Sequence, residues 1–369
     1  MKVLHFYKTS YPTTIGGVEQ VIHNLARGSQ SHGVVCDVLS LSSHHKSATQ
    51  KIDGYQIHYA HQLFEIASTG FSLDVIPIFK KLAQSADMIH YHYPWPFMDL
   101  VHFLVRPNKP TVVSYHSDVI RQKHLLKLYN PLKHKFLSDV DVIVASSPNY
   151  LNSSEDLNRY REKVRVIPYG LERESYKEPT LDLLKKWKSK VGDKFFLFVG
   201  VLRYYKGLHT LIDAAKGLNF PIVIVGTGPM EESLKEQAGK LGIKHIHFLG
   251  AVSEKDKVTL IKLCYSVIFP SHLRSEAFGI TLLEGLAFGK PLISCEIGTG
   301  TTFVNINNET GLVIPPNDVQ ALRGAMQYLW DHPKEAFNMG RAAEKRYWKY
   351  FTADKMVRSY IKLYKSLLN

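Results

Sequence analysis

The sequence predicts an α/β protein made of two consecutive domains, each built on a parallel β-sheet. Its 369 residues exceed the range over which a single hydrophobic core keeps growing, so two domains of roughly 150 to 200 residues are expected. Short apolar runs rich in Val, Ile and Phe alternate with helical patterns, which is typical of strands connected by crossover helices. The alternation stops and restarts around a polar, charged stretch at residues 172–193, which we interpret as the linker.

The predicted elements follow from these runs in chain order. The first domain, residues 1–175, is expected to hold strands at residues 3–7, 35–41, 57–60, 88–92, 111–116, 142–146 and 164–168. The second domain, residues 176–349, is expected to hold strands at residues 195–200, 222–226, 245–249, 266–270 and 291–295. Apolar residues at helical spacing between positions 341 and 369 predict one or two C-terminal helices.

The charge of the chain favours anionic partners. Its 46 Lys and Arg against 33 Asp and Glu give a net charge of +13, which attracts nucleotides, nucleic acid or acidic lipid. Basic residues alternate with leucines in the segment 121–137, where the cations are Arg121, Lys123, Lys127, Lys133 and Lys135. Such a segment either rests on an anionic membrane surface or packs its leucines against the core. No nucleic-acid recognition motif accompanies the charge, so a nucleic-acid partner is not expected.

The cysteines and the N-terminus favour a cytoplasmic protein. Cys36, Cys264 and Cys295 are odd in number, widely spaced and outside any metal-binding spacing, which predicts reduced, buried thiols. The apolar run at the N-terminus is too short for a signal peptide, and no later run reaches the roughly 18 residues of a membrane span. The expected location is therefore the cytoplasm.

Two carboxylates flank a predicted helix start in the second domain. Apolar spacing from position 280 onward predicts a helix that begins after Gly279, where free N–H groups and the helix dipole attract phosphate. Glu276 is expected before the helix and Glu284 about two turns inside it, and both can accept hydrogen bonds from hydroxyls. This segment suits a nucleotide diphosphate sugar. The spacing by itself would better fit an amphipathic helix with solvated acids, so its interpretation depends on the surrounding motifs.

At these residues the chain resembles the retaining glycosyltransferase family 4, whose signature is Glu, seven residues and Glu, with Phe-Gly after the first Glu. The resemblance implies the GT-B fold, in which two facing nucleotide-binding-like domains enclose a cleft and the last helix, here about residues 350–369, returns to the first domain. It also implies that Glu276 and the amides after it hold the donor sugar, that the next amides hold the diphosphate and that Glu284 holds the ribose. The amides belong to Phe278, Gly279, Ile280, Thr281 and Leu282.

Two cations follow the first predicted strand of the second domain, at the carboxyl end where open α/β sheets bind ligands. The resemblance places Lys206, followed by glycine, on the departing diphosphate. The family's arginine directly follows the glycine at position 200, where this chain has Val201, so Arg203 is the available substitute. The alternative is that Arg203 and Lys206 are solvated turn residues.

Two glycine turns are assigned by the same resemblance, since glycine permits close backbone approach to a ligand. Gly228 lies in a turn that lines the nucleotide pocket, and Val252 lies near the base. Gly16 and Gly17 form the loop that closes over the donor phosphate or the acceptor. Without the resemblance, a glycine pair after a strand is most often only a tight turn.

Two further residues end a strand of the first domain. His116 resembles the family's histidine beside the C6 hydroxyl of the donor sugar, and Asp118 is expected to orient His116 or the acceptor. Asp139 and Asp141 spell the Asp-x-Asp of metal-dependent glycosyltransferases of another fold, but they lead directly into a predicted buried strand. We interpret them as a helix-to-strand junction and predict no metal.

The expected reaction is transfer of a sugar from a nucleotide diphosphate to a hydroxyl with retained anomeric configuration. Catalysis would be largely electrostatic, with no cofactor beyond the nucleotide-sugar substrate. Nearly the whole chain is similar to bacterial mannosyltransferases of O-antigen assembly. This similarity implies a GDP-mannose donor and a lipid-linked oligosaccharide acceptor at the cytoplasmic leaflet, where the enzyme would be peripheral. A UDP-sugar donor and a sugar-nucleotide epimerase of the same fold remain alternatives.

Overall fold

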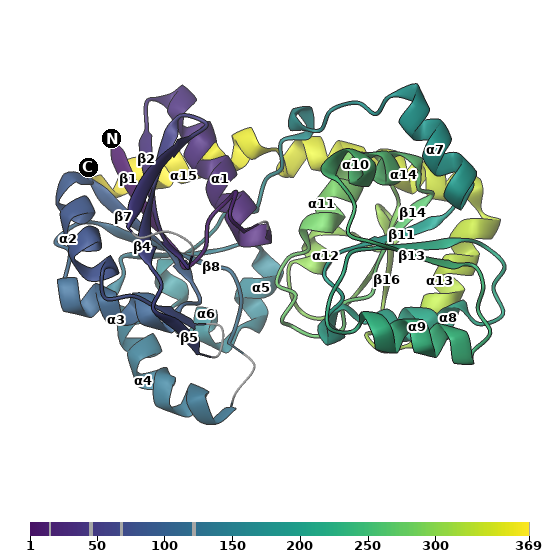
Figure 1. Ribbon diagram of the computed structural model, residues 1–369, viewed down its shortest axis with the longest axis horizontal. Helices are drawn as coiled ribbons and strands as arrows, with labels where there is room; N and C mark the ends of the chain where they lie inside the picture. Colours follow the sequence, from purple (N-terminus) through teal and green to yellow (C-terminus); the bar gives the residue numbers. More distant parts are fainter. Residues whose placement is uncertain (15, 44–46, 67–68, 120–122, 369) are drawn as a thin grey trace. The chain divides into compact units, whose positions relative to one another are not determined.

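The computed structural model describes residues 1–14, 16–43, 47–66, 69–119 and 123–368, with the side chains of residues 123–125 left out (Figure 1). The chain divides into two compact units. Unit 1 comprises Met1–Gly170 and Ala353–Asn369, and unit 2 comprises Leu171–Thr352. Both units consist of a β-sheet with helices on its faces, so the predicted α/β class with two parallel-sheet domains is confirmed.

Unit 1 is built on an eight-stranded sheet with the order β10-β9-β8-β7-β1-β2-β4-β3. Its strands are β1 (Lys2–Phe6), β2 (Val35–Ser42), β3 (Ala48–Ile52), β4 (Tyr55–His61), β7 (Met88–Tyr93), β8 (Thr111–Tyr115), β9 (Val142–Ala145) and β10 (Val164–Val166). Every pairing is parallel except that of β3 with β4. A separate two-stranded hairpin consists of β5 (Phe64–Ile66) and β6 (Thr69–Phe71).

The helices of unit 1 connect these strands. They are α1 (Gly17–Ser29), α2 (Val75–Ser85), α3 (Pro96–Val105), α4 (Lys123–Asp139), α5 (Pro148–Ser153), α6 (Glu155–Arg159) and α15 (Ala353–Leu368). The C-terminal helix α15 packs on α1. Its Tyr364 hydroxyl lies 2.7 Å from His90 Nδ1, and its Tyr360 hydroxyl lies 2.7 Å from Ser114 Oγ. The end of the chain is thus part of the unit 1 core.

Unit 2 is built on a fully parallel six-stranded sheet with the order β13-β12-β11-β14-β15-β16. Its strands are β11 (Phe196–Val199), β12 (Ile222–Val225), β13 (Ile246–Gly250), β14 (Ser266–Phe269), β15 (Leu292–Cys295) and β16 (Gly311–Ile314). Its helices are α7 (Leu181–Val191), α8 (Leu208–Ala215), α9 (Glu231–Lys240), α10 (Glu254–Leu263), α11 (Ile280–Ala287), α12 (Thr301–Val304), α13 (Val319–Asp331) and α14 (Pro333–Tyr350).

The strands of unit 2 form a sheet that is buried on both faces. All residues of β11, β12, β14 and β15 are buried, and these strands consist mainly of Val, Ile, Leu and Phe. Such continuous apolar runs are typical of parallel sheets covered by helices on both sides. In Figure 1, α10 and α11 cover one face, and α8 and α9 cover the other. Because helices cover both faces, a ligand can reach the sheet only through the loops at the ends of its strands.

The structure differs from the sequence prediction in the linker and in four short strands. Residues 172–193 contain α7, which buries Trp187 and Val191 and contacts α10. The indole of Trp187 donates a hydrogen bond of 2.7 Å to Asp256 on α10. Six of the eleven residues of α7 are charged or carry a hydroxyl, so its narrow apolar stripe was not recognised. Strands β3, β5, β6 and β16 were not predicted because each is short, exposed or low in β-branched residues.

The cysteines and the lengths of the helices were also predicted from the sequence. Cys36, Cys264 and Cys295 are buried and unpaired, as expected. Among the residues that the structure describes, every helix is too short or too polar to cross a lipid bilayer.

Candidate active site

The candidate site lies at the carboxyl edge of the unit 2 sheet. Strands β11, β12, β13 and β14 are parallel, so the loops that follow them meet at one edge. These loops carry the residues that the sequence singles out. They are Arg203, Lys206, Gly228, Val252, Glu276 and Gly279.

An ion pair joins two of these loops. A short 3-10 turn (Tyr204–Lys206) after β11 directs the ammonium of Lys206 onto the carboxylate of Glu276, which follows β14. Both side chains are only 12% exposed. The loops also share a hydrogen bond of 3.0 Å from the His272 amide to the Tyr205 carbonyl. A Cβ at Gly207 would lie 2.0 Å from the Pro270 carbonyl oxygen, so the close approach of the loops requires glycine.

Helix α11 begins where the Glu276 loop ends. Gly279 is its N-cap, with φ of 90°, and no side chain caps the helix. The N–H of Leu282 is bonded to the Gly279 carbonyl at 2.9 Å, whereas those of Ile280 and Thr281 have no bonded partner among the described residues. Two amides and the positive end of the helix dipole are therefore open to an anion. The Phe278 and Leu282 side chains are buried, so these residues can reach a ligand only through their backbone.

The loop before α11 is braced by its neighbours. Thr299 Oγ1 donates to the Glu276 carbonyl at 2.8 Å, and the Gly300 amide donates to the Ala277 carbonyl at 2.8 Å. Thr281 Oγ1 donates to the Val199 carbonyl at the end of β11, at 3.1 Å. These contacts fix the start of α11 relative to the sheet before any ligand binds.

Glu284 lies inside α11 and is buried, with two partners that sequence reasoning missed. Its Oε1 accepts hydrogen bonds from Lys257 Nζ at 2.7 Å and from the Tyr176 hydroxyl at 3.0 Å. Burial works against the charge on Lys257, but the carboxylates of Glu284 and Glu254 outweigh it and raise the pKa of the ammonium. Burial and the nearby Glu284 carboxylate raise the pKa of Tyr176. One signal was readable, because Lys257 lies four residues before the buried Ile261 on α10 and so shares its face.

Arg203 and Val252 lie at the carboxyl edge of the unit 2 sheet, and neither side chain forms a hydrogen bond or ion pair with a described residue. Arg203 is exposed, and its guanidinium forms no hydrogen bond or ion pair with a described residue. Val201, which occupies the position of the family's arginine, is also exposed. Val252 lies in the loop between β13 and α10. The free guanidinium of Arg203 is therefore available to a ligand.

Gly228 has a packing reason that does not involve a ligand. A Cβ at this position would lie 2.6 Å from both the amide nitrogen and the carbonyl oxygen of Leu202. Around it, Leu202 donates to the Thr227 carbonyl and accepts from the Met230 amide, each at 3.0 Å. The loops after β11 and β12 are thus joined backbone to backbone, which only glycine permits.

In unit 1, the structure places Gly16 and Gly17 at the start of α1, directly after the loop that follows β1. Gly16 is the N-cap, and Gly17 is the first residue of the helix. A Cβ at Gly16 would lie 2.4 Å from the Glu19 carboxylate, which is buried and accepts a hydrogen bond of 2.6 Å from Thr9. The absence of a side chain at Gly16 therefore makes room for Glu19.

His116 ends a row of hydrogen-bonded histidines in the unit 1 core. His5 Nδ1 lies 3.0 Å from His92 Nε2, His92 Nδ1 lies 2.9 Å from His116 Nε2, and His116 Nδ1 lies 2.5 Å from the Tyr169 hydroxyl. Burial lowers the pKa of His5 and of His116 to about 3, and it holds that of His92 well below its usual value. Both ring nitrogens of His116 are thus engaged by the protein, and the imidazole is neutral.

Asp118 lies in the loop after β8 and belongs to a polar network. Its Oδ1 accepts hydrogen bonds from the Tyr115 hydroxyl at 3.0 Å and from Ser154 Oγ at 2.7 Å. The Tyr115 hydroxyl also lies 3.0 Å from Asp156, which Lys133 approaches to 2.8 Å. Asp118 is therefore oriented by the ends of β8 and the start of α6.

Three histidines of unit 1 lie close enough together to be compared with a metal site. The ring nitrogens of His5, His90 and His92 lie within 4.8 Å of one another. His90 is already bonded to Tyr364 and Ser114, and His5 is bonded to His92, so these rings form a hydrogen-bonded cluster.

Asp139 is the last residue of α4 and Asp141 directly precedes β9, which confirms the predicted helix-to-strand junction. Asp139 bonds His102 at 2.7 Å, and Asp141 accepts from the Thr111 amide at 2.7 Å. Both carboxylates thus have structural partners.

The basic segment 121–137 forms most of α4. Arg121 lies outside the described residues, as do the side chains of Lys123 and Leu125. Phe136 and Leu137 are buried, and α4 packs on α3, whereas Leu128 is exposed. The C-terminal half of the segment therefore faces the core.

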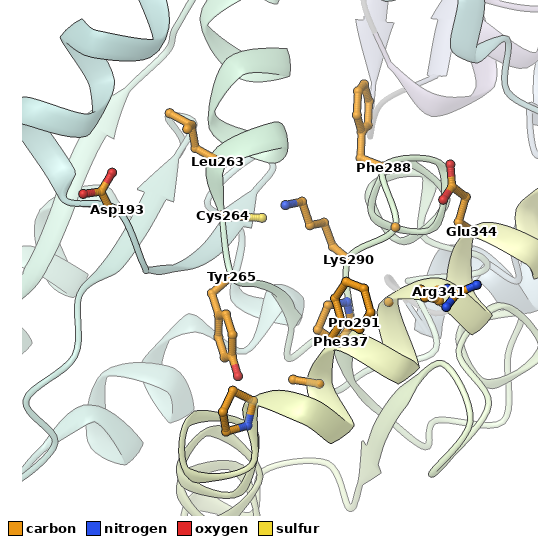
Figure 2. Close-up of a pocket in the computed structure, with 14 residues that line it drawn as sticks. Asp193, Leu263, Cys264, Tyr265, Phe288, Lys290, Pro291, Phe337, Arg341 and Glu344 are labelled. Atoms are coloured by element: carbon orange, nitrogen blue, oxygen red, sulfur yellow. The ribbon is translucent and has the colours of Figure 1, made fainter.

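A separate pocket of about 440 Å³ lies at the opposite edge of the unit 2 sheet (Figure 2). Its walls include Tyr265 and Pro291, which directly precede β14 and β15, together with Arg341 and Glu344 of α14. It contains none of the site residues that were predicted from the sequence. The predicted site residues of unit 2 lie at or beyond the carboxyl edge of the sheet.

Comparisons with protein families cover both units. A model described as glycosyl transferases group 1 matches residues 181–346, and one described as glycosyltransferase family 4 matches residues 15–175. The chain is 56% identical over 353 residues to the D-rhamnosyltransferase WbpZ of Pseudomonas aeruginosa, covering 96% of this chain and 93% of that protein. It is 50% identical over 368 residues to the O-antigen chain mannosyltransferase C of Escherichia coli, covering 100% and 99% of the two chains.

Solved structures share the fold. Sucrose-phosphate synthase from Thermosynechococcus elongatus matches with a TM-score of 0.80 at 18% identity, covering 99% of this chain and 98% of that one. HepE from Anabaena, solved in complex with UDP, matches with a TM-score of 0.77 at 18% identity and covers all of both chains. The two Rossmann-like units thus form the GT-B fold.

Proposed function

Because this chain belongs to glycosyltransferase family 4, as its motifs predict, we propose that it transfers mannose from GDP-mannose to a lipid-linked oligosaccharide in O-antigen assembly. The full-length similarity to an O-antigen mannosyltransferase supports this assignment. The observation that carries it is the pairing of Lys206 with Glu276 beside the open amides of α11. One cation, one carboxylate and a helix start are the groups that a sugar diphosphate requires.

In this proposal the donor replaces the ion pair. The diphosphate draws Lys206 away from Glu276, and its oxygens accept hydrogen bonds from the amides of Ile280 and Thr281. The released Glu276 carboxylate then accepts hydrogen bonds from sugar hydroxyls. Arg203, which is free in the structure, adds a second cation. Glu284, Gly228 and Val252 hold the nucleoside end, and Gly16 and Gly17 contact the phosphate or the acceptor.

Transfer then proceeds with retention on one face of the sugar. The bond from the anomeric carbon to the phosphate oxygen breaks through an oxocarbenium-like state, and the bond to the acceptor hydroxyl oxygen forms. The proton of that hydroxyl passes to the departing phosphate. Lys206, Arg203 and the α11 amides stabilise the developing charge, without a resident metal or cofactor. Glu276 serves as a hydroxyl acceptor and not as the nucleophile, since it matches the residue that holds the sugar hydroxyls in this family.

A specific observation favours a second donor, GDP-D-rhamnose. D-rhamnose is D-mannose without its C6 hydroxyl. A relative that is 56% identical over 96% of this chain is named a D-rhamnosyltransferase. His116, the residue expected at the C6 hydroxyl, has both nitrogens bonded to His92 and Tyr169. A site that does not bind a hydroxyl cannot strongly reject the analogue that lacks it. Discrimination between the two donors would therefore require His116 to release one partner.

The acceptor and location follow from the same proposal. A lipid-linked oligosaccharide is anchored in a membrane, so the enzyme would be cytoplasmic and peripheral on the inner face of the cytoplasmic membrane. The net charge of +13 supports contact with anionic lipid.

The test is a donor screen. Radiolabelled GDP-mannose, GDP-D-rhamnose and UDP-sugars are incubated with lipid-linked oligosaccharide acceptors, and the anomeric configuration of the product is read by NMR. Transfer from GDP-mannose with retention is expected. Transfer only from a UDP-sugar, or inversion, would contradict the proposal. Formation of a new sugar nucleotide in the absence of an acceptor would identify an epimerase.

A further inference from the structure

Seven large apolar side chains of unit 1 are exposed on neighbouring elements. We call them the apolar surface, and their exposed fractions lie between 40% and 81%. They come from the β5–β6 hairpin, the loop before α2, and helices α3 and α4, and they are Leu63, Phe64, Ile66, Leu73, Leu100, Leu104 and Leu128. Contacts join β5 to β6, β6 to α3, and α3 to α4, and Figure 1 shows the labelled β5, α3 and α4 in one region of unit 1. Scattered exposed leucines need no explanation, but a contiguous group does.

Helix α3 carries apolar side chains on its outward face as well as on its inward face. Its polar residues Asp99 and His102 are buried, at 0% and 4% exposed, while Leu100 and Leu104 face outward one turn apart. The inward groups have partners, since Asp99 accepts from Tyr129 and His102 bonds Tyr91 and Asp139. An ordinary surface helix places its polar residues toward water and its apolar residues toward the core. The outward leucines of α3 therefore serve something other than the unit 1 core.

The β5–β6 hairpin is anchored along one strand only. On β6, the Gly70 carbonyl accepts a hydrogen bond of 3.1 Å from the Trp95 indole, and the Phe71 ring packs 5.0 Å from that of Phe97. On β5, every residue is exposed, including Phe64 and Ile66. The hairpin thus holds two large apolar side chains away from the core on a fixed base.

Cations without ion-pair partners lie on α4 and on segments that adjoin the other elements of the apolar surface. Lys80 and Lys81 belong to α2, Arg106 and Lys109 follow α3, and Lys127 belongs to α4. Within the described part of the chain, none of these five forms a salt bridge or a side-chain hydrogen bond. Unpaired cations beside exposed leucines and a phenylalanine are the combination that binds anionic lipid surfaces. A second copy of this face would instead meet like charge.

We infer that the apolar surface is the face by which the protein enters the headgroup region of an anionic bilayer. The elements that carry it follow the carboxyl ends of β4, β7 and β8, the sheet edge at which His116 and Asp118 also lie. The inference therefore deepens the proposed function by giving a lipid-linked acceptor a docking face. From the basic segment of α4 it includes Lys127 and Leu128 and leaves out the C-terminal part, because that part buries Phe136 and Leu137.

The experiment is vesicle flotation of the full chain with phosphatidylcholine vesicles, with and without phosphatidylglycerol. Binding is expected only to the anionic vesicles and is expected to weaken with salt. Two variants remove apolar contacts, namely F64S with I66S on the hairpin and L100Q with L104Q on α3. Each variant is expected to lower the partition coefficient between vesicles and water by about tenfold or more, because it removes two apolar side chains that would insert into the bilayer. The matched control is L181Q, since Leu181 is 74% exposed on unit 2, and it should leave binding unchanged.

The outcomes separate the inference from the proposed function. Absence of vesicle binding, or equal binding by the wild type and both variants, overturns the inference. A wild-type dimer that the variants convert to monomers in light scattering would also overturn it, because the face would then join two copies. Transfer to a water-soluble acceptor analogue tests the proposed function alone, and both variants are expected to retain it. A protein that floats with vesicles but transfers no sugar would sink the proposed function and leave the docking face intact.

Discussion

Lys257 and Glu284 form an ion pair of 2.7 Å between α10 and α11, with side chains that are 17% and 4% exposed. Lys257 also lies 3.0 Å from Glu254, and the Tyr176 hydroxyl shares the Glu284 oxygen. The residue expected to hold the donor ribose is therefore paired and positioned before the donor arrives. The contribution of this pair to stability can be measured.

The first prediction concerns stability. Lys257→Met leaves the Glu284 carboxylate buried without its cation and should lower the free energy of unfolding by about 3 kcal/mol. The raised pKa of Lys257 means that its contribution is complete below the usual lysine pKa and is lost only as the pH rises through the folded-state value. The loss measured by urea denaturation should therefore be constant between about pH 6 and pH 9. Lys257→Met combined with Glu284→Gln should recover much of the stability, and no recovery would contradict a buried pair.

The second prediction concerns the other ion pair. Lys206→Ala removes the cation proposed to stabilise the departing diphosphate, so turnover should fall by about 10² to 10³. Glu276→Ala should lower turnover by a similar order, because the sugar hydroxyls lose their acceptor. Circular dichroism and thermal unfolding check that both variants are folded. Near-normal turnover in both variants would defeat the site assignment.

The third prediction separates Arg203 from the structure around it. Arg203 is exposed and has no partner among the described residues, so Arg203→Ala should change the free energy of unfolding by less than about 0.5 kcal/mol. If Arg203 contacts the diphosphate as proposed, turnover should still fall by about 10². Arg323→Ala is a matched control, since Arg323 donates hydrogen bonds to the Ala214 and Asp213 carbonyls near the C-terminal end of α8. That control should lose stability while the folded fraction keeps its turnover.

The fourth prediction concerns Gly228. A Cβ at this position meets the Leu202 backbone at 2.6 Å, so Gly228→Ala must shift one of the two loops. It should lower the free energy of unfolding by about 1 to 3 kcal/mol. Gly239→Ala is the control, because Gly239 lies in α9 and a Cβ there meets nothing within 4 Å. The control should raise stability by about 0.4 to 1 kcal/mol, since alanine restricts the unfolded chain.

The fifth prediction concerns acid. His5 and His116 have pKa values of about 3 in the folded chain because burial opposes their charged form. The unfolded chain binds their protons near the usual value of about 6.5, so stability is complete above that pH and is lost as the pH falls toward 3. His5→Phe removes one such group and should reduce the slope of stability against pH by about 1.4 kcal/mol per pH unit between pH 4 and pH 6. An unchanged slope, measured by denaturation at each pH, would show that His5 is protonated in the folded chain.

The sequence predicted the fold and much of the candidate site because both depend on local patterns. Apolar runs identified the strands of a parallel sheet, whose carboxyl ends meet at one edge. The family resemblance assigned both Lys206 and Glu276 to the donor. The partners of Glu284 were not predicted, because Tyr176 and Lys257 reach it only through the packing of α10 and α11. The outward leucines of α3 were also beyond prediction, since periodicity gives the spacing of a stripe but not which side faces water.

The interrupted course of unit 1 bears on how the chain is made. Its last helix, α15, is separated from α1 in the sequence by the whole of unit 2, yet Tyr360 and Tyr364 fill the core around His90 and Ser114. During synthesis, the inserted residues 171–352 are complete while the first unit still lacks a helix. The N-terminal half must therefore wait, with part of its interior uncovered, until α15 leaves the ribosome. Loss of α15 would thus destabilise the part of the protein that is translated first.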